Sequence, residues 1–547
     1  MKSFSTPLEA FLYWEKLSPN KDFLRQYHNG KLDILTFGEA GKQARSVARY
    51  LNELNHPKGS KIALLSKNCD FWVLADLAIM MSGHVSVPVY PTLKDDSIKP
   101  IIEHSESVLV FTGKLDNYHL RRIALNSIKK VGSEKYGIAE NLSWEHLVSQ
   151  YEPLEEMEQI DPKDLASIIY TSGTTGMPKG VMHSHENFAN GAFNISYDLN
   201  LGLHPKFFSY LPLCHIAERI GLENQAFLLG GSLTFSDSLE SFASNLESTQ
   251  PDLFFAVPRI WAKFQEKIRE GLPQKKLSTL LKIPFLGSVL KKKIRTKLGL
   301  SKAKYIASGA APLSADMIVW FNKLGIEILQ GYGMTEDCII SHCNLPSANK
   351  IGSVGKPTHG AVAKLSPIGE VCVKNNCLLL GYYKNPEVTA SVFDSEGFLK
   401  TGDIGEYDHD GYLTITGRAK DQFKTDKGKY ISPAPIELEL TKNTHIGQVC
   451  IVGMGIPQPI MLVIPSEQGQ QVSKEDLTES LLNSILEINP TLEKHEKIEK
   501  AVVMKEDWTI ANGLLTPTLK IKRSHVEKNH MPMYKSWFDS EERVIFE

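Results

Sequence analysis

A dense run of hydroxyl-bearing residues and glycines follows a short apolar stretch at residues 167–170. The run consists of Thr171, Ser172, Gly173, Thr174, Thr175 and Gly176, and Pro178, Lys179 and Gly180 come soon after it. Backbone N–H groups and hydroxyls at this density can surround phosphate oxygens, and Lys179 would add a positive charge. The Walker A spacing Gly-x-x-x-x-Gly-Lys-Ser/Thr is absent. The pattern therefore predicts a phosphate-binding loop of another kind.

A second candidate is the glycine-rich segment LQGYGMTED at residues 329–337. Gly331-Tyr332-Gly333 begins like a dinucleotide-binding fingerprint, but the third glycine is missing. Tyr332 could place its ring against a nucleobase, and Thr335 could contact a phosphate. Glu336 could bind Mg²⁺, which prefers one or two carboxylates together with substrate phosphates. Taken alone, the segment could also be a glycine-rich strand end.

A third candidate combines the turn Thr401-Gly402-Asp403 with Gly417-Arg418. A carboxylate at a turn could accept hydrogen bonds from both hydroxyls of a ribose. Either residue alone could equally belong to a surface turn or an ion pair.

Short apolar runs alternate with helical patterns through most of the chain, and this alternation predicts an α/β fold with largely parallel sheets. From about Gly352, Gly, Asp and Thr become frequent, and this change predicts hairpins and a small antiparallel sheet. Residues 417–433 are polar and rich in turn residues, and they are interpreted as a linker. About 115 residues follow, enough for a small second domain, so the boundary is placed near Lys420.

The composition is that of a globular protein, with 42% hydrophobic and 23% charged residues over 547 positions. It excludes a disordered chain, a collagen and a coiled-coil rod. The formal net charge of −2 gives no support for nucleic-acid binding. Seven cysteines without a Cys-x-x-Cys pair favour a reducing compartment, and a cytoplasmic protein is expected.

No apolar stretch has the character of a signal peptide or a spanning helix. The most apolar stretch, residues 71–90, contains Asp76, His84 and Pro88, and it is interpreted as a buried helix followed by a buried strand.

One segment differs from the rest in charge. Residues 271–304 contain ten Lys and Arg and no acidic residue. Within them, an apolar face at helical spacing is formed by Leu286, Val289, Leu290, Ile294 and Leu298. Such a basic amphipathic helix could lie on an anionic membrane surface, or it could be a surface helix with a solvated basic face.

Together the motifs resemble one family, the acyl-adenylate-forming synthetases, also called AMP-dependent synthetases and ligases. The resemblance covers nearly the whole chain. YTSGTTGMPKGV is similar to the family's phosphate-loop signature almost letter for letter, and QGYGMTE, TGD and GRAKD follow in the family's order and spacing. The chain looks most like the long-chain fatty acid–CoA ligase branch because of LPLCHIAER (211–219), KGKYISPAPIE (427–437) and LLTPTLKIKR (514–523).

The resemblance implies ATP-dependent ligation of a long-chain fatty acid to coenzyme A through an acyl-AMP intermediate, with release of AMP and pyrophosphate. It implies a large N-terminal adenylation domain (1–419) with a barrel-like β subdomain, and a mobile α+β lid domain (420–547). One alternative is a fatty acyl-AMP ligase that passes the acyl group to a carrier protein. Others are a catalytically inactive nucleotide- or lipid-binding protein and a P-loop kinase.

The resemblance also implies roles for individual residues. The loop from Thr171 to Gly176 and Lys179 would bind the pyrophosphate end of ATP, and the adenine and ribose would lie against Gly309, Ala310, Ala311, Gln330, Gly331, Tyr332, Asp403 and Arg418. Thr335 would contact the α-phosphate, Glu336 would bind Mg²⁺, and His215 would lie near the acyl carboxylate. Lys420 would be the hinge, and Lys520 the catalytic lysine.

Three departures from the family pattern bear on these roles. Leu519 stands where the usual motif has a glycine before the lysine, and Lys522 lies only two residues beyond Lys520. Asp426-Lys427-Gly428 stands where many relatives have Ser-Gly-Gly, and the resemblance implies that this loop borders the CoA route.

Overall fold

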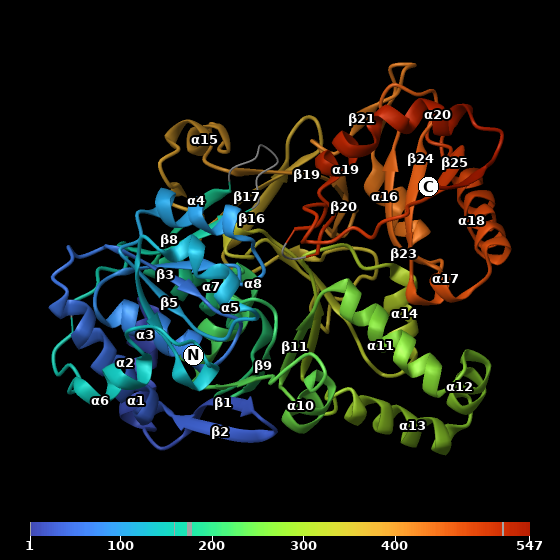
Figure 1. Ribbon diagram of the computed structural model, residues 1–547. Helices are drawn as coiled ribbons and strands as arrows, with labels where there is room; N and C mark the ends of the chain where they lie inside the picture. Colours follow the sequence, from blue (N-terminus) through green and yellow to red (C-terminus); the bar gives the residue numbers. More distant parts are fainter. Residues whose placement is uncertain (1, 158, 172–177, 517–518) are drawn as a thin grey trace.

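The computed structural model describes residues 2–157, 159–171, 178–516 and 519–547 (Figure 1). Two large sheets with helices form most of the chain, a small antiparallel sheet follows, and a mixed sheet with its own helices forms the C-terminal part. This is the predicted α/β class, with the small β subdomain and the α+β C-terminal domain.

The first large sheet has seven strands in the order β18-β8-β7-β4-β3-β5-β6. They are β3 (Lys61–Leu65), β4 (Val85–Val89), β5 (Leu109–Thr112), β6 (Lys129–Gly132), β7 (Leu165–Thr171), β8 (Lys179–Ser184) and β18 (Gly381–Tyr382). The strands from β6 to β7 are parallel, whereas β8 and β18 pair antiparallel. The candidate phosphate loop therefore connects two hydrogen-bonded neighbours, β7 and β8.

The second large sheet has nine strands in the order β15-β14-β13-β12-β11-β9-β10-β1-β2. They are β1 (Asp22–His28), β2 (Lys31–Thr36), β9 (Lys206–Ser209), β10 (Ser232–Phe235), β11 (Leu253–Ala256), β12 (Tyr305–Ser308), β13 (Leu329–Tyr332), β14 (His342–Cys343) and β15 (Lys356–Pro357). Strands β13 to β1 are parallel, so their carboxyl ends lie at one edge of the sheet. Ligands of open α/β sheets bind at this edge.

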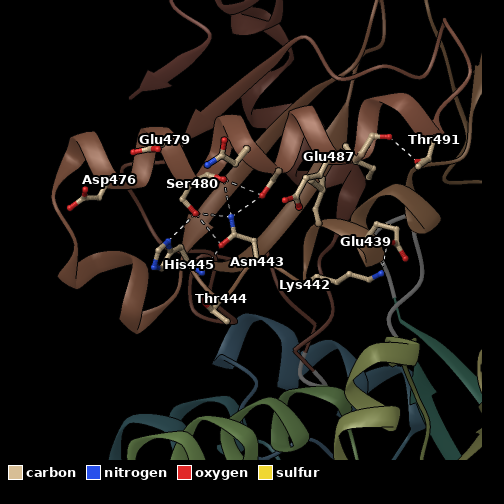
Figure 2. A pocket seen from close by; sticks show the side chains of 14 residues that line it. Glu439, Lys442, Asn443, Thr444, His445, Asp476, Glu479, Ser480, Glu487 and Thr491 are labelled. Carbon is tan, nitrogen blue, oxygen red and sulfur yellow. Dashed lines mark hydrogen bonds and ion pairs between the residues drawn. The ribbon is translucent and has the colours of Figure 1, made fainter. Parts of the chain in front are cut away.

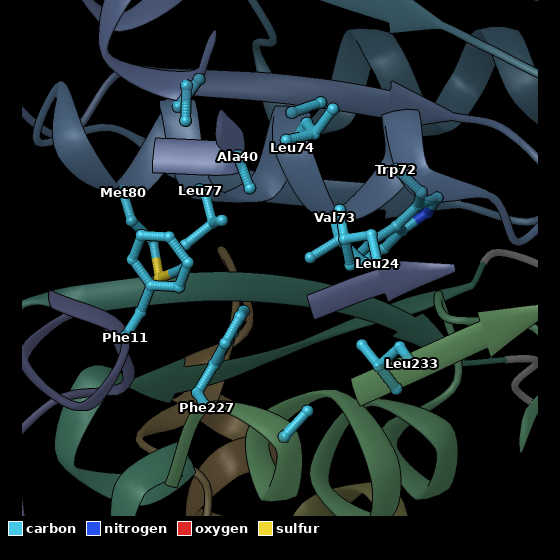
Figure 3. Close-up of a cluster of buried hydrophobic side chains, with 14 of the residues drawn as sticks. Phe11, Leu24, Ala40, Trp72, Val73, Leu74, Leu77, Met80, Phe227 and Leu233 are labelled. Atoms are coloured by element: carbon cyan, nitrogen blue, oxygen red, sulfur yellow. The ribbon is translucent and has the colours of Figure 1, made fainter. Parts of the chain in front are cut away.

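Six α-helices share one hydrophobic core with both large sheets (Figure 3). They are α1 (Pro7–Leu17), α2 (Phe37–Glu53), α3 (Asp70–Met81), α6 (Trp144–Gln150), α7 (His185–Leu199) and α9 (Asn224–Leu229). Every residue of α3 is buried, because Phe11, Phe227 and Leu233 from other elements pack around it. The prediction of a buried helix and strand at residues 71–90 is confirmed by α3 and β4. Among the described residues, no helix is both long and apolar enough to cross a membrane.

Other helices cover the outer faces of the two sheets. Helix α4 (Asp95–Ser105) packs on the seven-stranded sheet, and α10 (Phe242–Thr249), α11 (Pro258–Gly271), α12 (Gln274–Leu281), α13 (Pro284–Lys297) and α14 (Ala315–Lys323) lie on the side of the nine-stranded sheet that holds a separate core. Short helices α5 (Tyr118–Arg121) and α8 (Ile216–Glu218) complete the large domain.

The β subdomain is a four-stranded antiparallel sheet in the order β16-β17-β19-β20. Its elements are β16 (Ala361–Leu365), β17 (Glu370–Asn375), β19 (Leu399–Tyr407), β20 (Leu413–Arg418) and the adjoining helix α15 (Pro386–Ser391). This sheet confirms the hairpins expected after Gly352.

The C-terminal domain is built on the sheet β23-β24-β25-β26. Its elements are β23 (Ile446–Val452), β24 (Ile460–Pro465), β25 (Lys500–Val503), β26 (Val544–Phe546), α16 (Pro433–Leu440), α17 (Glu467–Gln471), α18 (Lys474–Ile488), α19 (Arg523–His530) and α20 (Tyr534–Asp539). The segment interpreted as a linker contains a hairpin, β21 (Phe423–Lys424) and β22 (Tyr430–Ile431). It is ordered because Phe423 and Ile431 are buried in the core of this domain.

Candidate functional site

The candidate phosphate loop begins and ends in a fixed register. Thr171 at the end of β7 lies opposite Lys179 at the start of β8. The Nζ atom of Lys179 lies 5.2 Å from the centre of the Tyr382 ring. Gly180 permits the tight pairing, because a Cβ atom there would lie 2.7 Å from the side chain of Ile168. Ser172, Gly173, Thr174, Thr175 and Gly176 lie outside the described residues.

The carboxylate of Glu336 lies next to this hairpin. It sits in the 3₁₀ turn Thr335–Asp337, directly after β13, and the hydroxyl of Tyr382 donates to its Oε1 at 2.8 Å. Burial raises the pKa of Glu336, while the hydrogen bond from Tyr382 and the nearby charges of Arg418 and Lys179 oppose that shift. One buried carboxylate beside a phosphate loop is a donor set that Mg²⁺ accepts when substrate phosphates supply further ligands.

The loops after β12 and β13 lie side by side. Ser308 and Gln330 are paired residues of these parallel strands, so residues 309–311 follow one strand and Gly331 and Tyr332 end the other. A Cβ atom on Gly309 would lie 3.1 Å from the carbonyl oxygen of Gly331, so a side chain there would crowd the neighbouring strand.

This edge also carries an unpaired acceptor and an unusual backbone conformation. Ala310 has a φ of +66°, in the left-handed region. The side-chain oxygen of Gln330 is buried and has no hydrogen-bond partner among the described residues. A buried acceptor without a partner is costly, and the amino group of a bound adenine could supply the missing donor.

Asp403 is held by two partners from different elements. The hydroxyl of Tyr332 donates to its Oδ2 at 2.6 Å, and Nε of Arg418 donates to its Oδ1 at 2.8 Å. The register of β19 and β20 places Asp403 directly opposite Arg418. The charge of Asp403 raises the pKa of Arg418, and burial, with Asp403 beside it, raises that of Tyr332. Asp403 is thus an acceptor fixed beside Tyr332, the last residue of β13.

Lys520 reaches this group from the C-terminal domain. Its backbone N–H donates to Oγ1 of Thr516 at 3.0 Å, within a turn that precedes α19. Its ammonium group lies in the field of Asp403 and Arg418. Crowding by protein atoms and repulsion from Arg418 lower the pKa of Lys520 to about 8, while Asp403 opposes the shift. Lys522 instead sits at the N-terminal cap of α19, and the described residues place it against none of the site's charges.

His215 lies at the start of α8 with a defined proton position. The N–H of Ala217 donates to its Nδ1 at 3.2 Å, so the neutral ring carries its proton on Nε2. Burial and the charge of Lys520 lower the pKa of His215 to about 4. The ring is therefore neutral at pH 7 and can donate one hydrogen bond to a carboxylate or acyl oxygen.

Sequence reasoning misses three residues that position the site. Asn68 and Glu218 hold the backbone just before His215, and Tyr382 contacts the carboxylate of Glu336. Asn68, at the edge of α3, accepts from the N–H of Leu213 at 2.9 Å and donates to the carbonyl oxygen of Leu211. Glu218 accepts from the N–H of Tyr210 at 2.8 Å, and burial raises its pKa to about 8. Asn68 and Tyr382 lie in no quoted motif, and Glu218 lies in LPLCHIAER without a role of its own, so only strand pairing and chain packing identify them.

The predicted hinge residue, Lys420, is exposed in the turn between β20 and β21. The N–H of the preceding Ala419 donates to the carbonyl oxygen of Gly402 at 2.9 Å. The turn therefore connects the strand that ends in Arg418 with the C-terminal domain.

A polar depression on the C-terminal domain, drawn in Figure 2, is lined by residues of α16, α18 and the chain after α16. Asn443 donates to the hydroxyls of Ser480 and Ser484, each at 2.8 Å, and Nδ1 of His445 lies 2.9 Å from Oγ of Ser480. These groups satisfy one another, so the depression has a structural explanation. None of the predicted site residues lines it.

The fold is an α/β fold with two large sheets, a small antiparallel sheet and a C-terminal mixed sheet, and Asp403, Arg418 and Tyr332 are in hydrogen-bond contact within it. The family model described as AMP-binding enzyme matches residues 14–383, and the model described as AMP-binding enzyme C-terminal domain matches residues 420–538. The chain belongs to the AMP-binding enzyme family.

Two curated relatives extend over most of the chain. Fatty acyl-CoA synthetase A of Dictyostelium discoideum is 26% identical, with 93% of this chain and 86% of the relative covered. Long-chain-fatty-acid–CoA ligase 5 of Rattus norvegicus is 29% identical, with 91% and 84% covered.

Solved structures share the fold over nearly the full length. An anthranilate CoA ligase in complex with anthranoyl-AMP is similar at a TM-score of 0.78 and 22% identity, with 97% of this chain and 98% of that chain covered. The A domain of a carboxylic acid reductase from Segniliparus rugosus, in complex with AMP and a carboxylic acid, is similar at 0.78 and 20% identity, with 97% and 94% covered.

Proposed function

We propose that this enzyme ligates a long-chain fatty acid to coenzyme A at the expense of ATP, through an acyl-AMP intermediate. The observation that carries the proposal is the hydrogen-bonded group of Tyr332, Asp403 and Arg418, which lies near enough to Lys520 of the C-terminal domain for its charges to act on that lysine. A cation that the small domain brings to this group would offset the negative charge that develops on the phosphates during adenylation. The names of the curated relatives support a fatty acid as the substrate and CoA as the acceptor.

In the first step, a carboxylate oxygen of the acid attacks the α-phosphorus of ATP, and the bond to the pyrophosphate oxygen breaks. Negative charge spreads over the phosphates, so fixed positive charges and hydrogen-bond donors at the site lower the barrier. Lys520 and Thr335 would act at the α-phosphate. The loop from Thr171 to Gly176, together with Lys179, would bind the departing pyrophosphate. Glu336 would hold Mg²⁺, which neutralises phosphate charge when bound.

Other residues of the site would orient the nucleotide and the acid. Asp403 would accept hydrogen bonds from the ribose, with Arg418 fixing its direction, and Gln330 would accept from the adenine. His215 would donate its Nε2 proton in a hydrogen bond to the acyl carboxylate. It stays neutral at working pH, because its pKa is about 4. Positioning of this kind accounts for much of the rate enhancement when two substrates must meet.

In the second step, the thiolate of CoA attacks the acyl carbon, and AMP departs with the electron pair of the broken bond. Lys520 has no role there, so we propose that the small domain turns about Lys420 and withdraws it. The chain would then comprise the adenylation domain 1–419 and the lid domain 420–547, with the boundary at the turn after Arg418.

We also propose that the enzyme works at a membrane surface within a reducing compartment, the cytoplasm. A long-chain acid resides mainly in bilayers, which makes peripheral contact useful. The seven cysteines, all free thiols, support the compartment.

The test uses purified enzyme and acids from acetate to oleate. We expect pyrophosphate exchange into ATP and CoA thioester formation to rise with chain length. Lys520→Ala should lower exchange by about 10²- to 10³-fold and leave thioester formation from preformed acyl-AMP intact. Lys522→Ala is the matched control and should retain exchange. Exchange without any CoA thioester would favour a carrier protein as acceptor, and absence of acid-dependent exchange would refute the proposal.

A further inference from the structure

Helices α12 and α13 form a hairpin at a corner of the molecule, far from α1 and α2 (Figure 1). The hairpin lies in the connection between β11 and β12, two adjacent parallel strands of the nine-stranded sheet. The residues after β12 are Gly309 and its neighbours, the candidate adenine loop. The hairpin is thus an insertion close in the chain to the site, and none of the roles proposed above uses it.

The apolar side chains of this hairpin fall into two groups. Leu290, Ile294 and Leu298 pack against the core on the nine-stranded sheet. Four others point to solvent, with exposed fractions of 45% for Ile283, 80% for Phe285, 48% for Leu286 and 53% for Val289. Leu286 and Val289 were expected on one apolar face with the buried residues. They are exposed because they lie on the side of α13 that faces away from the core, whereas Gly287, between them in the chain, is buried.

The four exposed side chains lie close together in the chain, between Ile283 and Val289, and are called here the apolar tip. Phe285 and Val289 are four residues apart on α13, so they lie on the same side of the helix, and Leu286 stands one turn before Val289. Exposed hydrophobic residues scattered singly are common on protein surfaces, but a continuous cluster marks an interaction site.

Five lysines flank the apolar tip in the sequence. Lys275, Lys276 and Lys282 precede it, Lys292 and Lys293 follow it, and all five are exposed. None of the five forms an ion pair with any residue that the structure describes, whereas Lys297 pairs with Glu247 at 2.9 Å. Residues 271–304 contain no acidic side chain to neutralise them.

We propose that the apolar tip and its lysines dock the enzyme on an anionic lipid bilayer. Phe285 and its apolar neighbours would enter the boundary between headgroups and acyl chains, while the lysines contact the lipid phosphates. A nucleic acid would match the charge but offers no apolar medium for Phe285. The inference rests on the proposed function only in explaining why the enzyme would bind a membrane, since a long-chain acid is taken up there.

The first test measures sedimentation of the full chain with vesicles, without ATP, CoA or fatty acid. We expect binding to equimolar phosphatidylglycerol and phosphatidylcholine at low salt, and little binding to phosphatidylcholine alone. Reversing Lys282, Lys292 and Lys293 to Glu should weaken partition by at least about tenfold, and high salt should do the same. The matched control reverses three exposed lysines elsewhere, Lys16, Lys31 and Lys42, and should keep most of the binding.

The second test addresses the apolar tip. The variant F285S/L286S/V289S should lose at least about fivefold in partition, and the control L17S/L239S/I368S, at scattered exposed positions, should not. In a Phe285→Trp variant, anionic vesicles should shift the indole emission to the blue. All variants should retain activity on a soluble shorter-chain acid, which shows that they are folded.

Several outcomes would overturn the inference. These are absence of wild-type binding to anionic vesicles at low salt, equal loss in the control triples, or unchanged binding after the serine substitutions. If the lysine reversals weakened CoA affinity but spared vesicle binding, the lysines would bind a soluble phosphate instead. Vesicle binding with no fatty acid activation would refute the proposed function alone.

Discussion

Lys442 and Asp316 form an ion pair of 2.8 Å that joins the C-terminal domain to α14 of the large domain. Lys442 also contacts Glu439 of its own domain at 2.7 Å. The hydrogen bonds to Asp316 and Glu439 raise the pKa of Lys442, so it is charged at pH 7. The pair forms in the arrangement that brings Lys520 to Asp403, and rotation of the small domain would break it.

The first prediction is that Asp316→Asn favours the rotated arrangement. Both side chains are substantially exposed, and such pairs contribute at most about 1 kcal/mol, so adenylation should fall by about twofold to fivefold. Thioester formation from preformed acyl-AMP should be unchanged or faster. The two half-reactions are measured separately by pyrophosphate exchange and by CoA thioester yield. Glu439→Gln, which removes the contact within one domain, is the control. Equal loss of both half-reactions in Asp316→Asn would contradict the idea.

The second prediction concerns pH. Lys520 has a pKa of about 8 in this arrangement, so its charge is present below that pH and is lost above it. The rate of adenylation should therefore decline above pH 8. At pH 9 it should be roughly tenfold lower than at a pH where Lys520 is fully charged.

Lys520→Arg serves as the discriminating variant, because a guanidinium stays charged throughout this range. Its residual adenylation, whatever its rate, should lack the decline above pH 8. His215 does not contribute to the profile there, since its pKa is about 4. A wild-type profile that stays flat to pH 10 would show that the charge of Lys520 is not what the step requires.

The residues at motif positions could be predicted from the sequence, and their partners could not. Asp403 and Arg418 were both predicted, but their hydrogen bond depends on the register of β19 and β20. Tyr382 reaches Glu336 only because β18 pairs with β8, some 200 residues earlier in the chain. Pairing between such distant segments leaves no periodic signal in either one.

The same limit applies to the fold. The composition of residues 71–90 alone predicts a buried helix and strand, because polar residues interrupt the apolar run. The periodicity of α13 predicts an apolar face but not how much of it is covered. That depends on which side of the helix meets the core, and this separates Leu286 and Val289 from Leu290 and Ile294.

The third prediction is that Glu336→Gln raises the Mg²⁺ concentration needed for adenylation. Glutamine keeps the size of the side chain and removes the charge that binds the metal ion. Tyr382→Phe keeps the charge and removes one hydrogen bond to it, so its effect should be smaller, about 10-fold in apparent metal affinity. Because burial raises the pKa of Glu336, the Mg²⁺ requirement of the wild type should also increase as pH falls.

The measurement for Glu336 is a titration of exchange activity with free Mg²⁺ at saturating ATP. The wild type, the two variants and Asp337→Asn are compared, because Asp337 is buried beside Glu336 and has a pKa raised to about 8. An Mg²⁺ titration of Glu336→Gln that matches the wild type would remove this carboxylate from the metal site.

The fourth prediction concerns Leu519, which precedes Lys520 where the family pattern has a glycine. Its φ is +63°, in the left-handed region that glycine occupies without strain. Leu519→Gly would relieve about 1 kcal/mol of backbone strain, but a glycine also gives the unfolded chain about as much extra freedom, so the two effects should nearly cancel. Little burial is lost, since the side chain is 43% exposed.

Leu519→Val should increase the backbone strain that glycine relieves, because a β-branched residue is a stronger outlier at positive φ. It should lower the free energy of unfolding by about 1 kcal/mol, or displace Lys520 and lower adenylation while sparing the thioester step. Urea unfolding and the two half-reactions measure these effects. Equal stability and activity for glycine, leucine and valine at this position would show that the turn before Lys520 relaxes freely, and that its backbone conformation does not position the lysine.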